Sequence, residues 1–325
     1  MSVARKFRML SGAARVGLGQ QSVPMHISWI VTNRCNLRCS YCNRPDDPTP
    51  ELTLDKALQL VDMLAAEGCV QLSITGGDPL VRQDLPMIMA RARRHGIKIN
   101  LNTNGILVPK REDVVRMADG VTVSLDGPPE VHDKIRGNTS FGKAVEGAKH
   151  ARKMGIPTRY YTVIGKSNIP ELDYLVGMAE DLPGEVFFQP GATYILGSGD
   201  GVNPDAAPEE HYKRGVDQLI AWKKQGRPIG NSVAGLEYIR NWPHPAPINC
   251  MGGRLFARID VDGQLRPCGR VPRGPENSVF GEGGIRGAMA RVKGPDCSAC
   301  YSAARTEVNL MCQGSPDALK NFFMR

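Results

Sequence analysis

Hydrophobic and polar positions change from strand-like to helix-like spacing in a regular order between residues 26 and 189. Short apolar or alternating runs predict strands at 26–32, 70–75, 98–103, 121–125, 158–164 and 185–189. Apolar residues at helical spacing predict helices at 54–65, 85–95, 112–118, 141–154 and 170–181. Thr53 and Asp84 stand where N-caps are expected. Strands that alternate with helices predict a parallel sheet, and six such units are too few for a closed eight-fold barrel. The pattern predicts a partial (β/α)6 barrel.

The pattern becomes irregular after residue 189. Residues 190–208 are rich in Gly, Pro and Asp, 209–225 have helical spacing, and Gly, Pro and Cys are frequent from 243 onward. Residues 255–261 alternate like a strand, and Asp262-Gly263 is a hairpin turn signal. We therefore expect four segments: a basic amphipathic stretch at 1–24, the barrel at 25–208, a helical linker at 209–242, and a small irregular α+β domain at 243–325.

Composition narrows the class of protein. The chain has 325 residues, 41% hydrophobic and 23% charged, which excludes wholesale disorder. No apolar run reaches the roughly 18 residues that a spanning helix needs, and no apolar stretch of a signal peptide follows Arg5, Lys6 and Arg8. We expect a cytoplasmic protein. Its nine cysteines are then expected to be metal ligands or catalysts more than disulfides.

Three cysteines, Cys35, Cys39 and Cys42, follow the first predicted strand within eight residues. Structural zinc takes four ligands, and no fourth Cys or His is near in the sequence. A [4Fe–4S] cluster held by three thiolates leaves one iron open to a substrate or cofactor. The spacing favours such a cluster, with zinc as the alternative.

This segment resembles the radical S-adenosylmethionine (SAM) superfamily, and the resemblance extends over about residues 25–190. Besides the CxxxCxxC loop it rests on Thr75-Gly-Gly-Asp-Pro at the second strand end, Asn102-Thr-Asn-Gly at the third, Ser124-Leu-Asp-Gly at the fourth, and the segments 132–137 and 163–165. It implies that SAM binds beside a [4Fe–4S] cluster on Cys35, Cys39 and Cys42. The implied SAM-binding residues are Tyr41, Gly76, Gly77, Asp78, Pro79, Asn102, Asn104, Ser124, Asp126, Arg136 and Ile164. Asp78 stands where the family usually has Glu, and Arg136 is expected to pair with the SAM carboxylate.

Five more cysteines lie in the last quarter of the chain: Cys250, Cys268, Cys297, Cys300 and Cys312. Four thiolates form a closed site for either zinc or a [4Fe–4S] cluster, and spacing alone leaves both open. The region resembles the SPASM/twitch extension of radical SAM enzymes. That resemblance implies one auxiliary [4Fe–4S] cluster on Cys250, Cys268, Cys297 and Cys300. Cys312 is then a buried thiol or an alternative ligand, and Cys69 is expected to be structural.

The resemblance implies a radical SAM oxidoreductase. SAM would be cleaved to a 5′-deoxyadenosyl radical that takes a hydrogen atom from a small-molecule or peptide substrate, with an electron from a flavodoxin- or ferredoxin-type donor. The auxiliary cluster would accept an electron, so the net reaction would be an oxidation within natural-product, cofactor or peptide biosynthesis. Beside Arg136, the candidate catalytic residues are proton acceptors: Asp260, Asp262, and Tyr161 or its neighbour Tyr160. Asp260 and Asp262 are also ordinary turn-forming residues.

The net charge of +8 adds a weaker signal. The first acidic residue is Asp46, so the first 45 residues carry seven Lys or Arg and no carboxylate. Arg34, Arg38 and Arg44 flank the cysteine loop and are expected to serve its anionic cofactors. Residues 1–20 form either a capping helix or an amphipathic contact with anionic lipid, which would suit a membrane-held substrate. A non-catalytic iron–sulfur carrier is the alternative from another class, although a carrier needs no SAM motifs. No nucleic-acid-binding module is apparent in the sequence, so we do not expect the protein to bind nucleic acid.

Overall fold

The computed structural model describes residues 24–137, 139–192, 202–269, 271, 274–292 and 300–323. In this described part, eight strands form one sheet in the order β6-β5-β4-β3-β2-β1-β7-β8. The strands are β1 (His26–Thr32), β2 (Gln71–Gly76), β3 (Lys98–Thr103), β4 (Gly120–Ser124), β5 (Thr158–Ile164), β6 (Val186–Pro190), β7 (Phe256–Ile259) and β8 (Leu265–Arg266). Every neighbouring pair is parallel except the antiparallel β7 and β8. The predicted open α/β barrel is confirmed.

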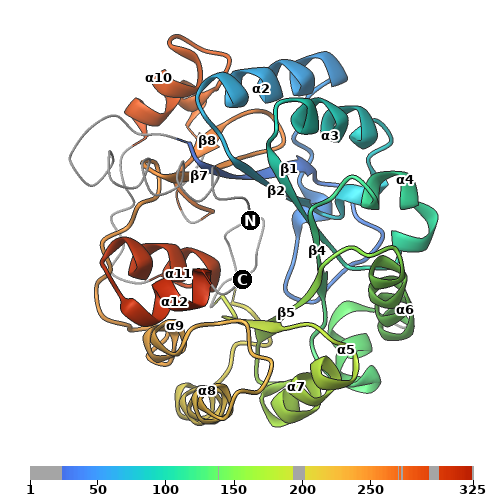
Figure 1. Cartoon of the computed structure of the whole chain (residues 1–325), viewed down its shortest axis with the longest axis vertical. Coiled ribbons are helices and arrows are strands. Elements are labelled where there is room, and N and C mark those ends of the chain that lie inside the picture. The colour runs from blue at the N-terminus through green and yellow to red at the C-terminus, as the bar shows by residue number, and fades with distance from the viewer. Residues whose placement is uncertain are drawn as a thin grey trace.

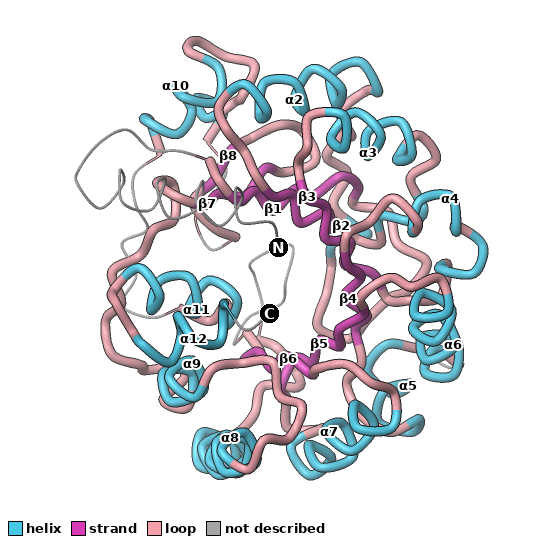
Figure 2. The backbone as a smooth tube through the Cα atoms, in the orientation of Figure 1, coloured by secondary structure: helices cyan, strands magenta, loops and turns pink. Residues whose placement is uncertain are grey.

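Helices cover the outer side of the curved sheet (Figures 1 and 2). The helices of the barrel are α2 (Leu54–Ala66), α3 (Leu85–Arg94), α4 (Glu112–Val115), α5 (Pro129–Arg136), α6 (Ser140–Lys153) and α7 (Leu172–Asp181). Those that follow are α8 (Glu209–Lys224), α9 (Val233–Ile239), α10 (Gly284–Arg291), α11 (Ala303–Cys312) and α12 (Pro316–Phe323). Thr53 caps α2 as expected, since its hydroxyl accepts the Lys56 N–H at 3.4 Å. Asp84 occupies the N-cap of α3 but makes no capping bond.

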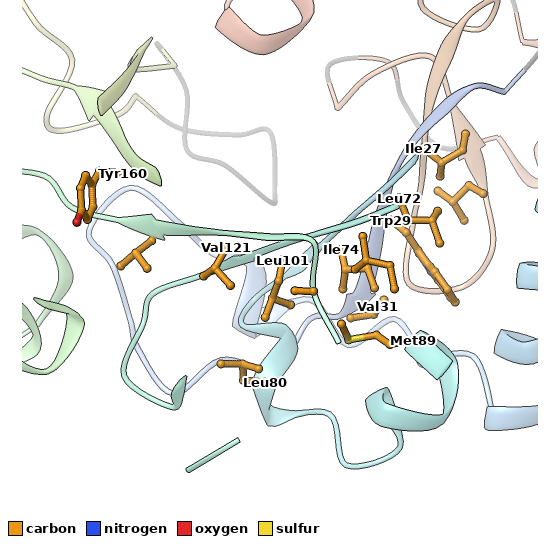
Figure 3. Packing of buried hydrophobic residues seen from close by; sticks show 14 of the residues in the cluster. Ile27, Trp29, Val31, Leu72, Ile74, Leu80, Met89, Leu101, Val121 and Tyr160 are labelled. Carbon is orange, nitrogen blue, oxygen red and sulfur yellow. The ribbon is translucent and has the colours of Figure 1, made fainter. Parts of the chain in front are cut away.

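The two faces of the sheet differ in chemistry. Alternate residues of a strand point to opposite faces. Those facing the helices, such as Trp29, Leu72 and Leu101, are completely buried. Figure 3 shows them on the side toward Met89 of α3. Residues of the other set line the concave side, or lumen, and are mostly polar and half-buried: Ser28, Ser73, Asn100, Asn102, Thr122, Ser124, Tyr161 and Gln189. The core therefore lies between sheet and helices, and the lumen offers polar groups to a ligand.

The last quarter of the chain continues the barrel sheet. β7 pairs in parallel with β1, and β8 returns beside it as the predicted hairpin. Gly263 in the turn has a φ of +85°, a value that suits glycine. Helices α9, α11 and α12 lie across the side of the ring that the sheet leaves open (Figure 2). The sequence pattern did not predict α5, α10, α11 or α12, whereas α9 lies in the expected helical linker at 209–242.

Two side chains hold the closing helices together. Glu307 of α11 accepts the Ser232 N–H at 2.8 Å, and Asp317 of α12 accepts the Ala234 N–H at 2.9 Å. Both carboxylates thus meet the N-terminus of α9, where the helix dipole favours negative charge. None of the described helices is long and apolar enough to cross a bilayer. The basic segment at 1–20 lies outside the described residues.

Candidate active site

The first three cysteines lie together on the loop that follows β1. This loop is anchored to α5 because the Ser40 N–H donates to the Ile135 carbonyl at 2.9 Å. Cys35, Cys39 and Cys42 are each half-buried and unpaired by disulfides. The thiols are close enough for the charges of Cys39 and Cys42 to act on Cys35. The Leu37 N–H donates to Cys35 Sγ at 3.4 Å.

Burial makes two of these thiols, those of Cys35 and Cys39, weaker acids. It raises the pKa of Cys35 to about 11, against the opposing hydrogen bond from Leu37. Burial also raises the pKa of Cys39, and the positive charge of Arg136 opposes it. Without a bound cation both thiols are protonated at neutral pH. Metal ligation requires thiolates, so loading the site releases protons.

The first cysteine loop offers three thiols to a metal centre. Three soft thiolates from one loop match iron–sulfur ligation. The residues present therefore fit a three-thiolate cluster.

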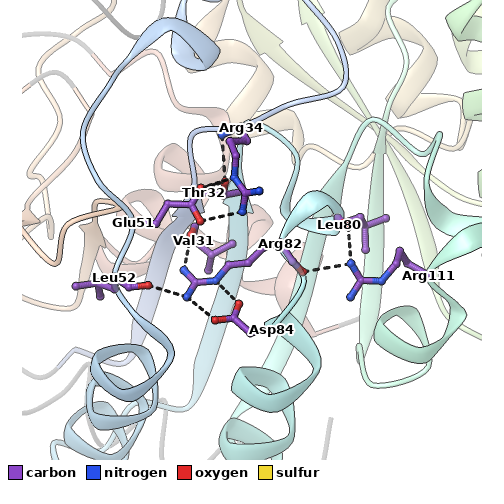
Figure 4. Close-up of polar contacts among 9 residues, drawn as sticks. All are labelled: Val31, Thr32, Arg34, Glu51, Leu52, Leu80, Arg82, Asp84 and Arg111. Carbon is purple, nitrogen blue, oxygen red and sulfur yellow. Dashed lines mark hydrogen bonds and ion pairs between the residues drawn. The ribbon is translucent and has the colours of Figure 1, made fainter.

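A polar network supports the base of the cysteine loop (Figure 4). Arg34, next to Cys35, donates from Nε and Nη2 to the two oxygens of Glu51 at 2.8 and 3.1 Å. The Thr32 hydroxyl donates to the same carboxylate and accepts the Arg34 N–H. This bidentate pair fixes the exit of the chain from β1.

Arg82 is a second anchor and is 3% exposed. Its Nη1 donates to the Val31 carbonyl at 2.7 Å, its Nη2 to the Leu52 carbonyl at 2.8 Å, and its Nε to Asp84 at 2.6 Å. The pairing with Arg82 explains why Asp84 does not cap α3. Removing this guanidinium would take away the donor that a half-buried carboxylate and two carbonyls share.

Gly76 and Gly77 bring the end of β2 against the chain that leads into the cysteine loop. A Cβ on Gly77 would lie 2.3 Å from the Arg34 carbonyl oxygen, and one on Gly76 would lie 2.3 Å from that of Thr32. The Gly77 N–H donates to the Thr32 carbonyl at 2.8 Å. Only glycine permits this approach, so the motif sets the position of Cys35.

Asp78 joins β2 to β3. Its fully buried carboxylate accepts from the Thr103 hydroxyl at 2.7 Å and from the N–H groups of Asn104 and Leu80 at 2.8 and 3.0 Å. Burial raises its pKa, and these hydrogen bonds oppose the rise. Pro79 follows in the buried 3-10 helix η2 (Pro79–Val81). The motif is thus a structural joint at the sheet edge where SAM is expected.

Arg136 is engaged within the protein. Its Nε donates to Asp126 Oδ2 at 2.5 Å, and its guanidinium lies 5.7 Å from the centre of the Tyr41 ring. Asp126 also accepts from the Val163 N–H at 3.1 Å and from the Tyr41 hydroxyl at 3.4 Å. Burial lowers the pKa of Arg136, but the charges of Asp126, Tyr41 and Cys39 and the hydrogen bond to Asp126 together raise it overall. The pairing with the SAM carboxylate remains a prediction, and the structure provides Asp126 as the partner.

The other expected SAM contacts have separate positions. The Asn104 amide donates to Asn36 on the cysteine loop at 2.8 Å. Asn102 donates to the Ser73 hydroxyl across the lumen face. Ser124 lies in the lumen in register with Tyr161. Ile164 is 1% exposed and belongs to the core cluster, so its neighbour Val163 is the residue on the lumen side of β5.

The later cysteines gather at the opposite end of β1. Cys250 precedes Met251, whose neighbours Leu255 and Phe256 adjoin the start of β1. Cys300 is near enough for the charge of Cys250 to act on it. The Pro267 carbonyl, next to Cys268, and Cys250 Sγ both lie about 3 Å from a Cβ placed on Gly252. Cys297 lies outside the described residues. β1, which lies between this group and the first cysteine loop, has seven residues and is about 20 Å long.

Cys312 and Cys69 occupy other positions. Cys312 is the last residue of α11, about 14 Å along the helix axis from its start beside Cys300. It is half-buried and packs against the same small apolar cluster as Cys250, whose buried residues include Met25 and Val70. Cys69 is buried in the main core, where burial raises its pKa to about 12. The position of Cys69 suits a structural thiol, and Cys312 keeps both roles that the sequence left open.

The proposed proton acceptors differ in environment. Tyr161 faces the lumen, stacks on Phe187, and donates to Gln189 at 2.7 Å. Burial raises its pKa, as do the charges of Tyr301 and Cys300. Tyr160 is excluded as an acceptor because it faces the helices and bonds to the Leu182 carbonyl.

The two aspartates are committed to the protein. Asp260 is completely buried and pairs with Arg258 at 2.6 Å and Arg266 at 2.7 Å. Asp262 accepts the Gln264 N–H within the hairpin turn. Both carry out the structural role that turn chemistry suggests, and their role as bases remains a prediction.

Sequence reasoning missed the lumen arginines of the last quarter. Arg258 is in register with Ser28, and Arg266 is opposite Arg258. Burial lowers the pKa of Arg44 to about 10, Arg258 also lowers it, and Cys42 and Asp260 oppose this. The alternation of Ala257 and Ile259 with Arg258 and Asp260 could have indicated a polar inner face for β7.

Comparisons with known proteins indicate the family of this chain. A family model described as the radical SAM superfamily matches residues 29–178. The AdoMet-dependent heme synthase of Methanosarcina barkeri is 27% identical over 280 residues, covering 78% of this chain and 79% of the relative. The solved structure of native anSMEcpe with bound AdoMet has a TM-score of 0.64 at 14% identity and covers 93% of this chain and 100% of that one.

A further solved structure is Streptococcus suis SuiB bound to the precursor peptide SuiA. It has a TM-score of 0.61 at 15% identity over 80% of this chain. The chain spans 63% of SuiB, which is less than two thirds of that protein's length. At such identities the solved structures support the fold.

Proposed function

Since the chain belongs to the radical SAM superfamily, we propose that it is an oxidoreductase that cleaves SAM and oxidises a substrate held in the lumen. When bound, the first cluster supplies the electron that converts SAM to methionine and a 5′-deoxyadenosyl radical. The observation that carries the proposal is the placement of two sets of cysteines at opposite ends of one polar lumen. The first set is on the loop after β1, and the second is the group of later cysteines. This arrangement allows an electron to enter at one end and leave at the other.

Each part of the lumen has a distinct task in this proposal. Cys35, Cys39 and Cys42 hold the first cluster, and Asn104 orients their loop. Asn102 and Ser124 face the volume between the ends and can hydrogen-bond to SAM or substrate. The lumen-facing Tyr161 lies near Cys300 and can hold or pass a proton. The sheet and its helices exclude water from a reactive radical.

Our proposal for the substrate class draws on the relatives of this chain. One relative is a heme synthase, and one structural neighbour binds a precursor peptide. We place this chain in cofactor or peptide-modification biosynthesis, with a flavodoxin- or ferredoxin-type donor and a cytoplasmic location. A lipid substrate would depend on residues 1–20, which are not described.

The decisive experiment distinguishes the roles of the two sets of cysteines. Anaerobically reconstituted protein is given SAM and a chemical reductant, and iron content and 5′-deoxyadenosine are measured. We expect Cys39→Ala to lose the product completely, because the open-iron cluster needs all three thiolates. We expect Cys268→Ala to lose about half of the iron and to keep SAM cleavage.

Cys312→Ala is the matched control, because it removes a thiol that the proposal leaves outside both clusters. It should retain iron content and 5′-deoxyadenosine. Absence of 5′-deoxyadenosine from the fully loaded wild-type protein would refute the enzyme and favour an iron–sulfur carrier. Loss of iron in Cys312→Ala would instead assign Cys312 as a ligand.

A further inference from the structure

Three arginines from separate elements lie close together beside the lumen, between the first cysteine loop and the later cysteines. Arg258 of β7 is in register with the lumen residue Ser28 in the middle of β1. Arg266 of β8 is paired with Arg258 across the hairpin. Arg44, two residues after Cys42, is within charge-interaction range of both. We call these three residues the arginine cluster.

One carboxylate contacts two arginines of the cluster. Asp260 accepts from Nε of Arg258 at 2.6 Å and from Nη2 of Arg266 at 3.1 Å. Arg266 also donates to the Val271 carbonyl at 2.8 Å. Arg44, the third arginine, has no carboxylate partner among the described residues.

Two arginines of the cluster, Arg44 and Arg258, keep guanidinium donors without an acceptor among the described residues. The Arg44 guanidinium donates from Nη1 to Asn33 Oδ1 at 3.3 Å and makes no second side-chain hydrogen bond there. Arg258 uses Nε alone, and its Nη1 lies 2.7 Å from a Cβ placed on Gly269, beside Cys268. Shielded cations are costly unless an anion pairs with them. Guanidinium groups match the two oxygens of a carboxylate or phosphate.

We propose that the arginine cluster binds an oxyanion of the substrate, a carboxylate or a phosphate group, and so holds the substrate between the SAM site and the auxiliary thiols. This inference rests on the proposed function and adds the chemical class of the substrate. The cluster belongs to β7, β8 and the loop after Cys42. Most of the expected SAM contacts lie instead at the ends of β2, β3 and β4, and neither β7 nor β8 carries one. The position therefore favours substrate over the SAM carboxylate.

The test uses succinate as the probe and its neutral analogue succinamide as the reference. Binding to the anaerobically reconstituted protein is measured by calorimetry at constant ionic strength. We expect saturable binding of succinate and none of succinamide. Arg258→Gln should weaken succinate binding at least tenfold, because it removes one fork of the site. Arg94→Gln, an exposed arginine on α3 with the same change of charge, should leave binding unchanged.

A second variant guards against misfolding. Arg44→Lys keeps the charge and loses the fork, and it should weaken succinate binding while iron content stays the same. The proposal is overturned by wild-type protein that does not bind succinate, by equal binding in all variants, or by displacement of succinate when SAM is added. The last result would assign the cluster to the SAM carboxylate.

Failure of this inference is distinct from failure of the proposed function. SAM cleavage to 5′-deoxyadenosine without substrate depends on the first cysteine loop. The arginine cluster could instead only balance the negative charge of the first iron–sulfur cluster. In that case Arg258→Gln will shift the reduction potential of the iron–sulfur cluster and leave succinate affinity unchanged. That outcome would overturn the inference and leave the enzyme proposal standing.

Discussion

At the scale of single residues, the expected SAM site is built from groups that first serve the protein. Asp78 joins two strands, Gly77 permits close approach to Arg34, and Arg136 pairs with Asp126. These residues act as positioning residues whose contacts determine where Cys35 and Tyr41 lie. The polar groups that remain open to a ligand, such as Ser124, are on the lumen faces of the strands.

The Arg136–Asp126 pair gives a residue-scale prediction. Arg136→Met leaves a completely buried carboxylate unpaired and should reduce the free energy of unfolding by about 3–5 kcal/mol. The double variant Arg136→Met with Asp126→Asn should recover part of this loss, because no lone charge remains. Urea unfolding of the holoprotein measures both. A loss below about 1 kcal/mol together with a raised KM for SAM would show that Arg136 contacts SAM.

Residue identity along the chain was enough to predict the cysteine loop and the polar strand ends, because those groups are adjacent in sequence. The arginine cluster could not be found in this way. Arg44 and Arg258 are brought together by the pairing of β1 with β7, which no local pattern specifies. The pairing of Arg136 with Asp126 was missed for a different reason. The two residues are close in sequence, and each was interpreted as a separate contact to SAM.

At the scale of elements, the β7–β8 hairpin links the barrel to the auxiliary thiols. Its turn residue Gly263 combines a φ of +85° with close contact, since a Cβ there would lie 2.8 Å from the Phe280 ring. Gly226 has the same φ and no atom within 4 Å of an added Cβ. Comparing alanine substitutions at the two glycines therefore separates the effect of backbone strain from the effect of crowding by neighbouring side chains.

We expect Gly226→Ala to lower the free energy of unfolding by about 1 kcal/mol through strain alone. Gly263→Ala should lose about 1–3 kcal/mol more, because the Phe280 ring must move. It should also reduce auxiliary iron, since Cys268 follows β8. Thermal unfolding and iron analysis of both variants provide the comparison. Equal losses would mean that the Phe280 ring adapts freely.

Most elements of the barrel could be predicted because each strand and helix carries its own period. The closing helices could not. α11 and α12 are short, and α11 is held by contacts such as Glu307 with Ser232 from a distant helix. Its stability comes from tertiary contacts more than from its own pattern.

At the scale of the whole molecule, two buried histidines predict how stability depends on pH. Burial lowers the pKa of His26 and of His132 to about 4, and the positive charges of Arg305 and Arg136 act in the same direction. Between pH 6.5 and 4 the unfolded chain binds protons that the folded chain does not. Stability therefore falls as pH falls through this window, by about 1 kcal/mol per histidine between pH 7 and 5.5.

His132→Gln removes one of these groups and should flatten the loss of stability between pH 7 and 5.5. His244 is exposed, so His244→Gln should keep the wild-type slope. Urea unfolding at several pH values under anaerobic conditions gives the slopes. Because any acid loss of clusters affects all three proteins, only the difference between the two variants is interpreted. Identical slopes would contradict the assignment of a neutral buried His132.

The pairing of β1 with β7 also bears on how the chain is made. Ile27 and Ala257, which lie side by side in the sheet, are about 230 residues apart in sequence. At ordinary rates of synthesis, β1 waits about 10–50 s on the ribosome for its second neighbour. During that time one edge of the strand is open to wrong pairing, and long-range contacts of this kind slow folding. The cysteine loop directly after β1 is therefore accessible to cluster assembly well before the barrel closes around it.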